Sequence, residues 1–202
     1  PGAFKIYRKI DCPLEGHPVM YRLEDKGGRK VPVGIPGVDF AAGSLGHGLS
    51  AAAGMALHAV VYGYDYRVYA VVGDGDMQEG MSWEALLTIP NKKLGNLCAI
   101  YDYNRLQVDG GVESINQLEP MRAKLEAFNW DVREIDGHDF CAIIDALVYF
   151  RQGERQPGRP LMILAHTVKG KGVAEIENDY RYHALPLSVE MYERAEKDFL
   201  AR

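Results

Sequence analysis

Four short apolar segments, each ended by a glycine or a polar residue, constrain this 202-residue chain most strongly. The first is rich in β-branched residues and all four are short, which favours buried β-strands, and segments with helical patterning separate them. The predicted strands are Arg67–Val72, Leu97–Asn104, Val132–Ile135 and Pro160–Thr167. Buried strands that alternate with helices form parallel sheets covered by those helices. The sequence therefore predicts an α/β fold, with a doubly wound, mostly parallel sheet and helices on both faces.

The segments between and around these strands predict the helices. Leu45–Val61 is dominated by small and apolar residues, which predicts a buried helix. A helix that begins at Glu79 should end at Ile89, because Pro90 lacks the N–H that would continue it. Residues 25–37 are rich in Gly, Pro, Lys and Arg, which predicts a long exposed loop. The other expected helices are Glu119–Phe128, Phe140–Phe150 behind the N-cap Asp139, and a last one behind the N-cap Ser188.

Composition excludes several classes of protein. A net charge of -5 without any basic stripe argues against binding to nucleic acid. Cys12, Cys98 and Cys141 are widely spaced and odd in number, so neither a disulfide framework nor a zinc site is expected. This pattern favours a reducing compartment, and we expect a cytoplasmic protein. No apolar run approaches the roughly 20 residues that cross a bilayer, and no signal peptide is visible.

The loops that follow the predicted strands are the expected place for a ligand, because parallel sheets bind ligands at the carboxyl ends of their strands. After the first strand, Gly73 and Gly75 let backbone amides approach a diphosphate, and Asp74 offers a carboxylate oxygen. Asn104 follows the next strand, and its amide oxygen could join Asp74 around one Mg²⁺. Each motif alone also fits an ordinary turn, but the two together favour a metal site. Asp76 receives no role.

The motifs, taken in order, resemble the thiamine-diphosphate signature of transketolases. "GDGDMQEG" at Gly73 and "YNRLQVDG" at Tyr103 carry the signature, and "LEGHP", "PGVDFAAGSLGHGLSAAAGMAL", "DGHD" and "HTVKGKG" match along the rest of the chain. The likeness covers nearly the whole chain and is similar to the N-terminal, diphosphate-binding subunit of split, two-gene transketolases. It implies one diphosphate domain over residues 1–202, without an N-terminal segment that the family usually has, and an insertion at residues 19–35.

The resemblance implies a site for thiamine diphosphate with Mg²⁺, or with Ca²⁺ or Mn²⁺ in its place. Asp74 and Asn104 would bind the metal through their side chains, and Leu106 through its carbonyl oxygen. Gly75 would lie against the diphosphate. The other residues implied at the cofactor are Ser44, Leu45, Gly46, Gly73 and His166.

The resemblance also implies a reaction and the residues that serve it. A two-carbon ketol unit would pass from a ketose donor, phosphorylated or otherwise anionic, to an aldose acceptor. His17 and His183 match histidines that hydrogen-bond the donor sugar, and histidine suits proton transfer at neutral pH. Glu79 and Glu84 match glutamates near the subunit interface that couple two cofactor sites. Without the family, these two glutamates would be read as a charged helix face.

One part that the reaction needs is not found in these residues. In the family, the glutamate that activates the aminopyrimidine belongs to a separate pyrimidine-binding domain, together with most residues that recognise the phosphate of the sugar. We therefore expect a partner, the C-terminal transketolase subunit, in an α₂β₂ assembly. His47 replaces the usual glutamine of "GSLGQG", which leaves the accepted sugar open.

Three further residues have simpler interpretations. His58 lies on the apolar helix and is interpreted as a packed core histidine. His138 is expected to order the turn into its helix. Lys169 could neutralise phosphate, although a lysine in a glycine loop is more often solvated.

Three other functions compete with the transketolase interpretation. The α subunit of a 2-oxo acid dehydrogenase usually shows paired asparagines where this chain has Tyr103 and Asn104. Deoxyxylulose-phosphate synthases keep both domains on one chain. A non-catalytic nucleotide-binding regulatory module predicts G-x-G-x-x-G after a first strand, and Met77 does not fit that pattern.

Overall fold

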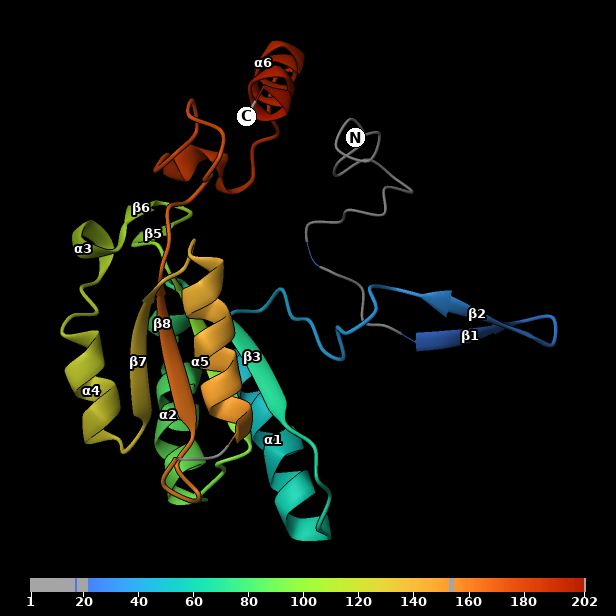
Figure 1. The fold of residues 1–202 in the computed structure, drawn as a ribbon, viewed down its shortest axis with the longest axis vertical. Coiled ribbons are helices and arrows are strands. Elements are labelled where there is room, and N and C mark those ends of the chain that lie inside the picture. The colour runs from blue at the N-terminus through green and yellow to red at the C-terminus, as the bar shows by residue number, and fades with distance from the viewer. Residues whose placement is uncertain (1–16, 18–21, 153–154, 202) are drawn as a thin grey trace. The chain divides into compact units, whose positions relative to one another are not determined.

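The computed structural model describes residue 17, residues 22–152 and residues 155–201. The chain divides into two compact units between Ser44 and Leu45. Figure 1 labels elements of both units. The prediction of one diphosphate domain over residues 1–202 stays a prediction.

The first unit contains a β-hairpin. Strands β1 (Arg22–Lys26) and β2 (Arg29–Val33) pair antiparallel. Gly27 and Gly28 form the turn between them with φ of 66° and 84°, values that glycine adopts readily. The prediction of a loop over residues 25–37 is therefore wrong where the hairpin runs. A Gly-Gly pair between two short strands is a hairpin turn, and the charged residues around it hid this pattern.

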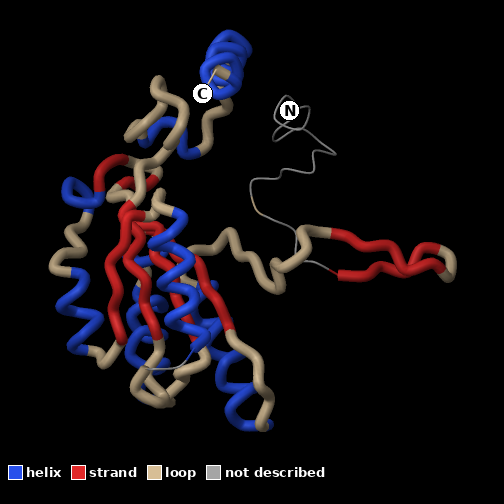
Figure 2. The backbone as a smooth tube through the Cα atoms, viewed as in Figure 1, coloured by secondary structure: helices blue, strands red, loops and turns tan. Residues whose placement is uncertain are grey.

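The second unit is built on a parallel four-stranded sheet, which confirms the predicted fold class. Its order is β3-β4-β8-β7, and each neighbouring pair is parallel. Gly73 pairs with Asp102 and Tyr103 pairs with His166, so the carboxyl ends of three strands meet at one edge. Figure 2 shows the strands as one layer among the helices. The strands are β3 (Val68–Gly73), β4 (Leu97–Tyr103), β7 (Asp131–Asp136) and β8 (Leu161–His166).

Helices cover both faces of this sheet (Figure 1). Helices α1 (His47–Tyr62) and α2 (Gly80–Asn91) join the larger hydrophobic cluster on one face. Helix α5 (Phe140–Gln152) forms a smaller cluster with β4 and β8 on the other face. In the described part of the chain, no helix has the length and apolar character that crossing a membrane requires. The remaining elements are α3 (Val112–Ile115), α4 (Met121–Ala127), α6 (Val189–Leu200), the short strands β5 (Leu106–Gln107) and β6 (Gly110–Gly111), and 3₁₀ helices at Asp76–Gln78 and Tyr180–His183.

Two predicted helix caps are confirmed. The Oδ1 of Asp139 accepts a hydrogen bond from the Cys141 N–H at 2.8 Å. The Oγ of Ser188 accepts one from the Met191 N–H at 3.2 Å. Both bonds satisfy backbone donors that have no partner inside the first turn of their helix.

Pro90 does not end α2 at Ile89, so that prediction is wrong. The helix continues to Asn91, with Pro90 inside its last turn. Proline cannot donate to the carbonyl four residues earlier, which belongs to Leu86. The indole N–H of Trp130 donates to that carbonyl instead, at 2.9 Å. Because a side chain satisfies the carbonyl, the helix tolerates the proline.

The strand β3 and the helix α1 are less buried than predicted. Alternate residues of β3 face the core, but Val71 between them is 72% exposed. On α1, Leu49 and Ala56 are fully buried, whereas Val61 and Tyr62 are exposed. β3 is an edge strand, and α1 presents only one side to the sheet. Apolar composition alone does not show which of these sides is covered.

His58 is not a core residue, which corrects its simpler interpretation. It is exposed on α1. Its ring lies 4.7 Å from the ring of Tyr62 and 5.3 Å from that of Tyr64, measured between centroids. Its Nδ1 lies 2.8 Å from the hydroxyl of Tyr66. His58 therefore belongs to a surface cluster of aromatic rings.

Candidate cofactor and metal site

Asp74, directly after β3, is a buried carboxylate with 2% of its surface exposed. The Tyr101 hydroxyl donates to its Oδ1 at 2.7 Å, and the Arg105 backbone N–H donates to its Oδ2 at 2.7 Å. Burial raises the pKa of Asp74, and these two hydrogen bonds oppose the rise without cancelling it. An ionised carboxylate in this place is unfavourable by itself, so a bound cation would stabilise it.

The hydrogen bond from Arg105 holds Asp74 against the turn that carries Asn104 and Leu106. The Leu106 N–H donates to the Oδ1 of Asn104 at 2.9 Å, so Asn104 also caps this turn. Arg105 has φ of 65°, a left-handed conformation that is uncommon for arginine. Unusual backbone conformations of this kind often occur at functional sites, where the surrounding structure holds them.

The carbonyl of Leu106 is directed away from the strand that pairs with it. Leu106 pairs with Gly111, and Gln107 pairs with Gly110 across a two-residue turn. In such a hairpin the pair next to the turn exchanges hydrogen bonds, and the following pair does not. Asp74, Asn104 and Leu106 therefore offer a carboxylate, an amide oxygen and a backbone carbonyl, which are the ligand types that Mg²⁺ accepts.

Asp76 ties the glycine loop after β3 to the start of α1. Its Oδ1 accepts from the Gly46 N–H at 2.9 Å, and its Oδ2 accepts from the Gly73 N–H at 3.0 Å. Sequence reasoning missed this role, because Asp76 and Asp74 look alike in a glycine turn. Only the fold brings Gly46 within reach, and no local pattern indicates that contact.

Two glycines lie in close packing around this loop. Gly46 precedes α1 with φ of 80°, and a Cβ there would lie 2.9 Å from the Cβ of Glu79. A Cβ on Gly75 would lie 3.2 Å from the side chain of Leu45. Leu45 and Gly46 therefore lie against Gly75 and Glu79, and the fold brings these predicted site residues together.

Glu79 and Glu84 lie at the start and in the middle of α2. Glu79 precedes the helix without a side-chain cap bond. Both side chains are exposed. An interface role requires exposure, but coupling between subunits stays a prediction.

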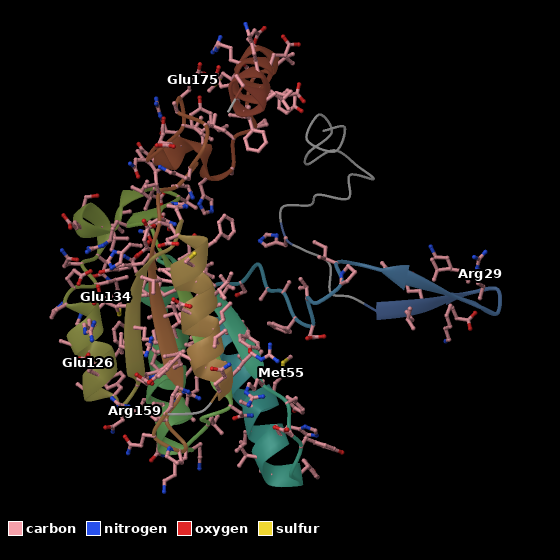
Figure 3. All side chains as sticks on the ribbon, in the orientation of Figure 1. Arg29, Met55, Glu126, Glu134, Arg159 and Glu175 are labelled. Atoms are coloured by element: carbon pink, nitrogen blue, oxygen red, sulfur yellow. The ribbon has the colours of Figure 1, made fainter. Side chains whose placement is uncertain are left out.

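His166 ends β8 and faces a carboxylate of β7. Its Nε2 lies 2.9 Å from Oε2 of Glu134. This hydrogen bond, and a further one from Arg122, hold the pKa of Glu134 below its ordinary value. Arg122 also reaches Glu126, and Figure 3 labels both glutamates. His166 therefore belongs to a charged network over β7 and α4, and its role at the cofactor stays a prediction.

The loop after β8 joins two further histidines. The Nε2 of His138 accepts from the Val168 N–H at 2.7 Å, which fastens the turn before α5 to this loop. The Nδ1 of His183 lies 3.1 Å from the Nζ of Lys169. His183 is exposed in its 3₁₀ helix. Lys169 therefore has a histidine partner rather than only solvent.

His17 is exposed in the first unit and packs closely on Gly43. A Cβ on Gly43 would lie 2.8 Å from the Nε2 of His17. Ser44 is the last residue of the same unit. The predicted roles of His17 and Ser44 beside the loops of the second unit stay predictions.

A metal at the edge of the sheet would be bound by few charged side chains. Among the described residues, no three His, Cys, Asp or Glu side chains gather closely enough to hold a metal ion. A site built on Asp74 would use neutral oxygens and the phosphate oxygens of its ligand, which is the usual arrangement of Mg²⁺ beside phosphates. The residues present therefore fit a magnesium diphosphate.

Comparison with known proteins gives the family. Residues 4–199 match the family described as "Transketolase, thiamine diphosphate binding domain". The chain belongs to this family. The 6-deoxy-6-sulfo-D-fructose transketolase subunit SqwG of Clostridium sp. (strain MSTE9) is 42% identical over 159 residues, which are 79% of this chain and 57% of that protein. One subunit of the apulose-4-phosphate transketolase of Phocaeicola vulgatus is 37% identical over 189 residues, 94% of this chain and 62% of that protein.

Solved transketolases share the fold of this chain. The enzyme from Campylobacter jejuni superposes with a TM-score of 0.76 at 29% identity, covering 97% of this chain and 29% of its own. The enzyme from Leishmania mexicana gives a TM-score of 0.77 at 27% identity, covering 98% and 29%. The resemblance to transketolases is thus confirmed. The chain spans about 60% of the length of the two curated relatives, so the activity of a whole protein is a matter for proposal.

Proposed function

We propose that this chain is the diphosphate-binding subunit of a transketolase that uses thiamine diphosphate and Mg²⁺. The observation that carries the proposal is the buried carboxylate of Asp74, held against the turn of Asn104 and Leu106. The reaction is the reversible transfer of a two-carbon ketol unit from a ketose to an aldose. Thiamine diphosphate, when bound, supplies the electron sink that stabilises the carbanion of the two-carbon unit.

The share of this chain in that reaction is to bind and orient the diphosphate. The metal would be held by the side chains of Asp74 and Asn104 and the carbonyl of Leu106. Gly73 and Gly75 would let backbone N–H groups approach the phosphate oxygens. Because Asp74 is buried, solvent screens its attraction for a cation only weakly.

The entry to α1 would meet the other end of the cofactor. Ser44, Leu45 and Gly46 would contact the aminopyrimidine through their backbone, and His166 would lie nearby. The packing of Leu45 on Gly75 supports this placement, because it sets the α1 entry beside the glycine loop. The bonds of Asp76 to both segments keep them together.

Two histidines would bind the donor sugar. His17 and His183 would hydrogen-bond hydroxyls of the donor and move a proton near its carbonyl. An ammonium group can only donate, so the Lys169 contact makes Nδ1 of a neutral His183 the acceptor. The hydrogen of that imidazole then sits on Nε2.

The proposal includes a partner protein. Both curated relatives are named as transketolase subunits. The partner would carry the pyrimidine-binding domain and the glutamate that activates the aminopyrimidine, in an α₂β₂ assembly. Glu79 and Glu84 would face the interface and couple the cofactor sites, which their exposure supports.

The donor sugar would carry an anionic group. The names of the two relatives specify sugars with a sulfo group and with a phosphate. We extend this class to the present chain, with a phosphate or a sulfonate on the ketose. The widely spaced cysteines support a cytoplasmic location.

The test is a ketol-transfer assay of this chain assembled with its partner. Donors with a phosphate or a sulfonate are compared with matched donors that lack the anionic group. We expect turnover that needs thiamine diphosphate and Mg²⁺, stops on chelation and returns with added Mg²⁺. Full turnover by the purified chain alone would contradict the partner. Tight binding of a nicotinamide dinucleotide in place of thiamine diphosphate would contradict the whole proposal.

A further inference from the structure

Asp102 is a second carboxylate at the carboxyl edge of the sheet. It lies in β4, between Gly73 of β3 and Ala165 of β8, and it is partly buried. The Nδ2 of Asn104 donates to its Oδ2 at 3.1 Å. The hydroxyl of Thr167 donates to its Oδ1. Both oxygens of Asp102 therefore accept hydrogen bonds beside the candidate metal site.

The contact matters because an asparagine side chain has two ends of similar shape. One end is an oxygen and the other an NH₂ group, so a site can hold the amide in either orientation. Only the oxygen can bind a cation. The carboxylate of Asp102 has no hydrogen to donate, so it pairs only with the NH₂ end of Asn104. The Leu106 N–H can only donate, and it meets Oδ1 of Asn104 at 2.9 Å. Both neighbours select the same orientation.

We propose that Asp102 and Thr167 are positioning residues, which keep the amide oxygen of Asn104 directed at the metal site. Thr167 belongs to the loop after β8, and its hydroxyl restrains the rotation of the Asp102 carboxylate. The orientation of Asn104, directly after β4, thus depends on a residue that directly follows β8. This inference rests on the Mg²⁺ part of the proposed function, and neither residue is among the proposed metal ligands.

A charge effect alone would give a different result from positioning. The negative charge of Asp102 attracts a nearby cation whatever the orientation of Asn104. Asp102→Asn removes this charge but keeps an oxygen that can accept from the NH₂ of Asn104. Asp102→Ala removes both the charge and the acceptor. Positioning therefore predicts that asparagine rescues what alanine loses, whereas a charge effect predicts equal losses.

The test is calorimetric titration of Mg²⁺ into the assembled enzyme in the presence of excess thiamine diphosphate. We expect Asp102→Ala to weaken Mg²⁺ binding by about 10- to 100-fold, the usual cost of losing a partner behind a metal ligand. Asp102→Asn should bind within about threefold of the wild type, as for a substitution that keeps its contacts. Thr167→Val should weaken binding and Thr167→Ser, which keeps the hydroxyl, should not. Asp109→Ala removes an exposed acid of the same segment and serves as the matched control.

An exchange of the two side chains sharpens the test. Asn104→Asp alone places two carboxylates against each other, so we expect Mg²⁺ binding to weaken. Adding Asp102→Asn supplies an NH₂ group behind the new carboxylate, which then directs an oxygen at the metal. The double variant should bind at least about tenfold more tightly than Asn104→Asp alone, a coupling within the range for residues in contact.

Two results would overturn the inference. Equal Mg²⁺ affinities in Asp102→Ala and the wild type would exclude any role of Asp102 in metal binding. Equal losses of affinity in Asp102→Ala and Asp102→Asn would show that only the charge of Asp102 matters. Circular dichroism checks that each variant folds, and the Thr167 pair carries the test if Asp102→Ala does not fold. A wild-type enzyme that binds no Mg²⁺ with thiamine diphosphate would refute the proposed function itself, which is a separate outcome.

Discussion

The residues proposed for the metal and those proposed for the sugar differ in burial. Asp74 is 2% exposed and accepts hydrogen bonds from Tyr101 and Arg105, whereas His17 and His183 are exposed. A side chain that packing and hydrogen bonds hold, as they hold Asp74, is placed before a ligand arrives. We infer that this chain organises the diphosphate end by itself, while the sugar end needs contacts from its proposed partner.

Asp74→Ala is expected to have the largest effect on the proposed metal site. Losing a partner behind a metal ligand costs about 10- to 100-fold in affinity, and we expect more than about 100-fold for the ligand itself. Calorimetry of Mg²⁺ with thiamine diphosphate measures the loss, and circular dichroism checks the fold. Asp109→Ala, an exposed acid, is the control. Unchanged affinity in Asp74→Ala would show that the metal is bound elsewhere.

His183→Ala tests the sugar end separately. Removing a group that moves a proton lowers turnover by about 10²- to 10⁴-fold, and we expect a loss in this range for the assembled enzyme. The affinity for thiamine diphosphate and Mg²⁺ should stay the same, because His183 lies outside the hydrogen bonds around Asp74 that the structure describes. Steady-state kinetics and calorimetry check the two parts, with the exposed His58→Ala as control. A parallel loss of cofactor affinity would mean that the two ends are not separate.

Gly46→Ala tests how tightly the glycine loop is packed. Its φ of 80° and the approach of Glu79 both oppose a Cβ, and a left-handed conformation costs other residues about 1–2 kcal/mol. We expect a loss of that size in the free energy of unfolding, measured with urea. Gly48→Ala is the matched control, because a Cβ there meets nothing within 4 Å and it lies inside α1. Alanine in a helix should stabilise by about 0.5–1 kcal/mol relative to glycine. Equal effects at both positions would contradict the packing.

The raised pKa of Asp74 predicts a pH dependence in the metal-free chain. A carboxyl whose folded pKa lies above its ordinary value of 3.8 stabilises the fold while it is protonated. This stabilisation is lost as the pH rises through the folded pKa. Asp74→Asn removes that loss. Without metal, the variant should unfold at a higher temperature than the wild type at neutral pH, and the difference should vanish below pH 3.8. Thiamine diphosphate with Mg²⁺ should reverse the order. A difference independent of pH would contradict the burial of an ionisable Asp74.

The strands, and the meeting of the loops after β3 and β4, could be predicted because their signals are local. A short apolar run ended by Gly73 or by Asn104 identifies a buried strand and its end without any knowledge of the rest of the chain. Parallel strands place their carboxyl ends at one edge, so two adjacent strand ends were enough to bring Asp74 and Asn104 together.

The parts that were missed depend on contacts between distant segments. Asp76 binds Gly46, which is 30 residues away, and only the fold shows that pairing. His58 has the same apolar sequence neighbours whether its face of α1 is covered or exposed. Only the packing of α1 on the sheet shows that His58 is exposed. At residues 22–33, charged residues replaced the apolar alternation that usually indicates a hairpin.

Titration of thiamine diphosphate into the assembled enzyme at several Mg²⁺ concentrations tests the metal end most directly. We predict one site per copy of this chain, with an affinity that rises with Mg²⁺ and disappears in Asp74→Ala. Binding that does not depend on Mg²⁺, or that is equally tight in Asp74→Ala, would contradict the placement of the metal on this chain.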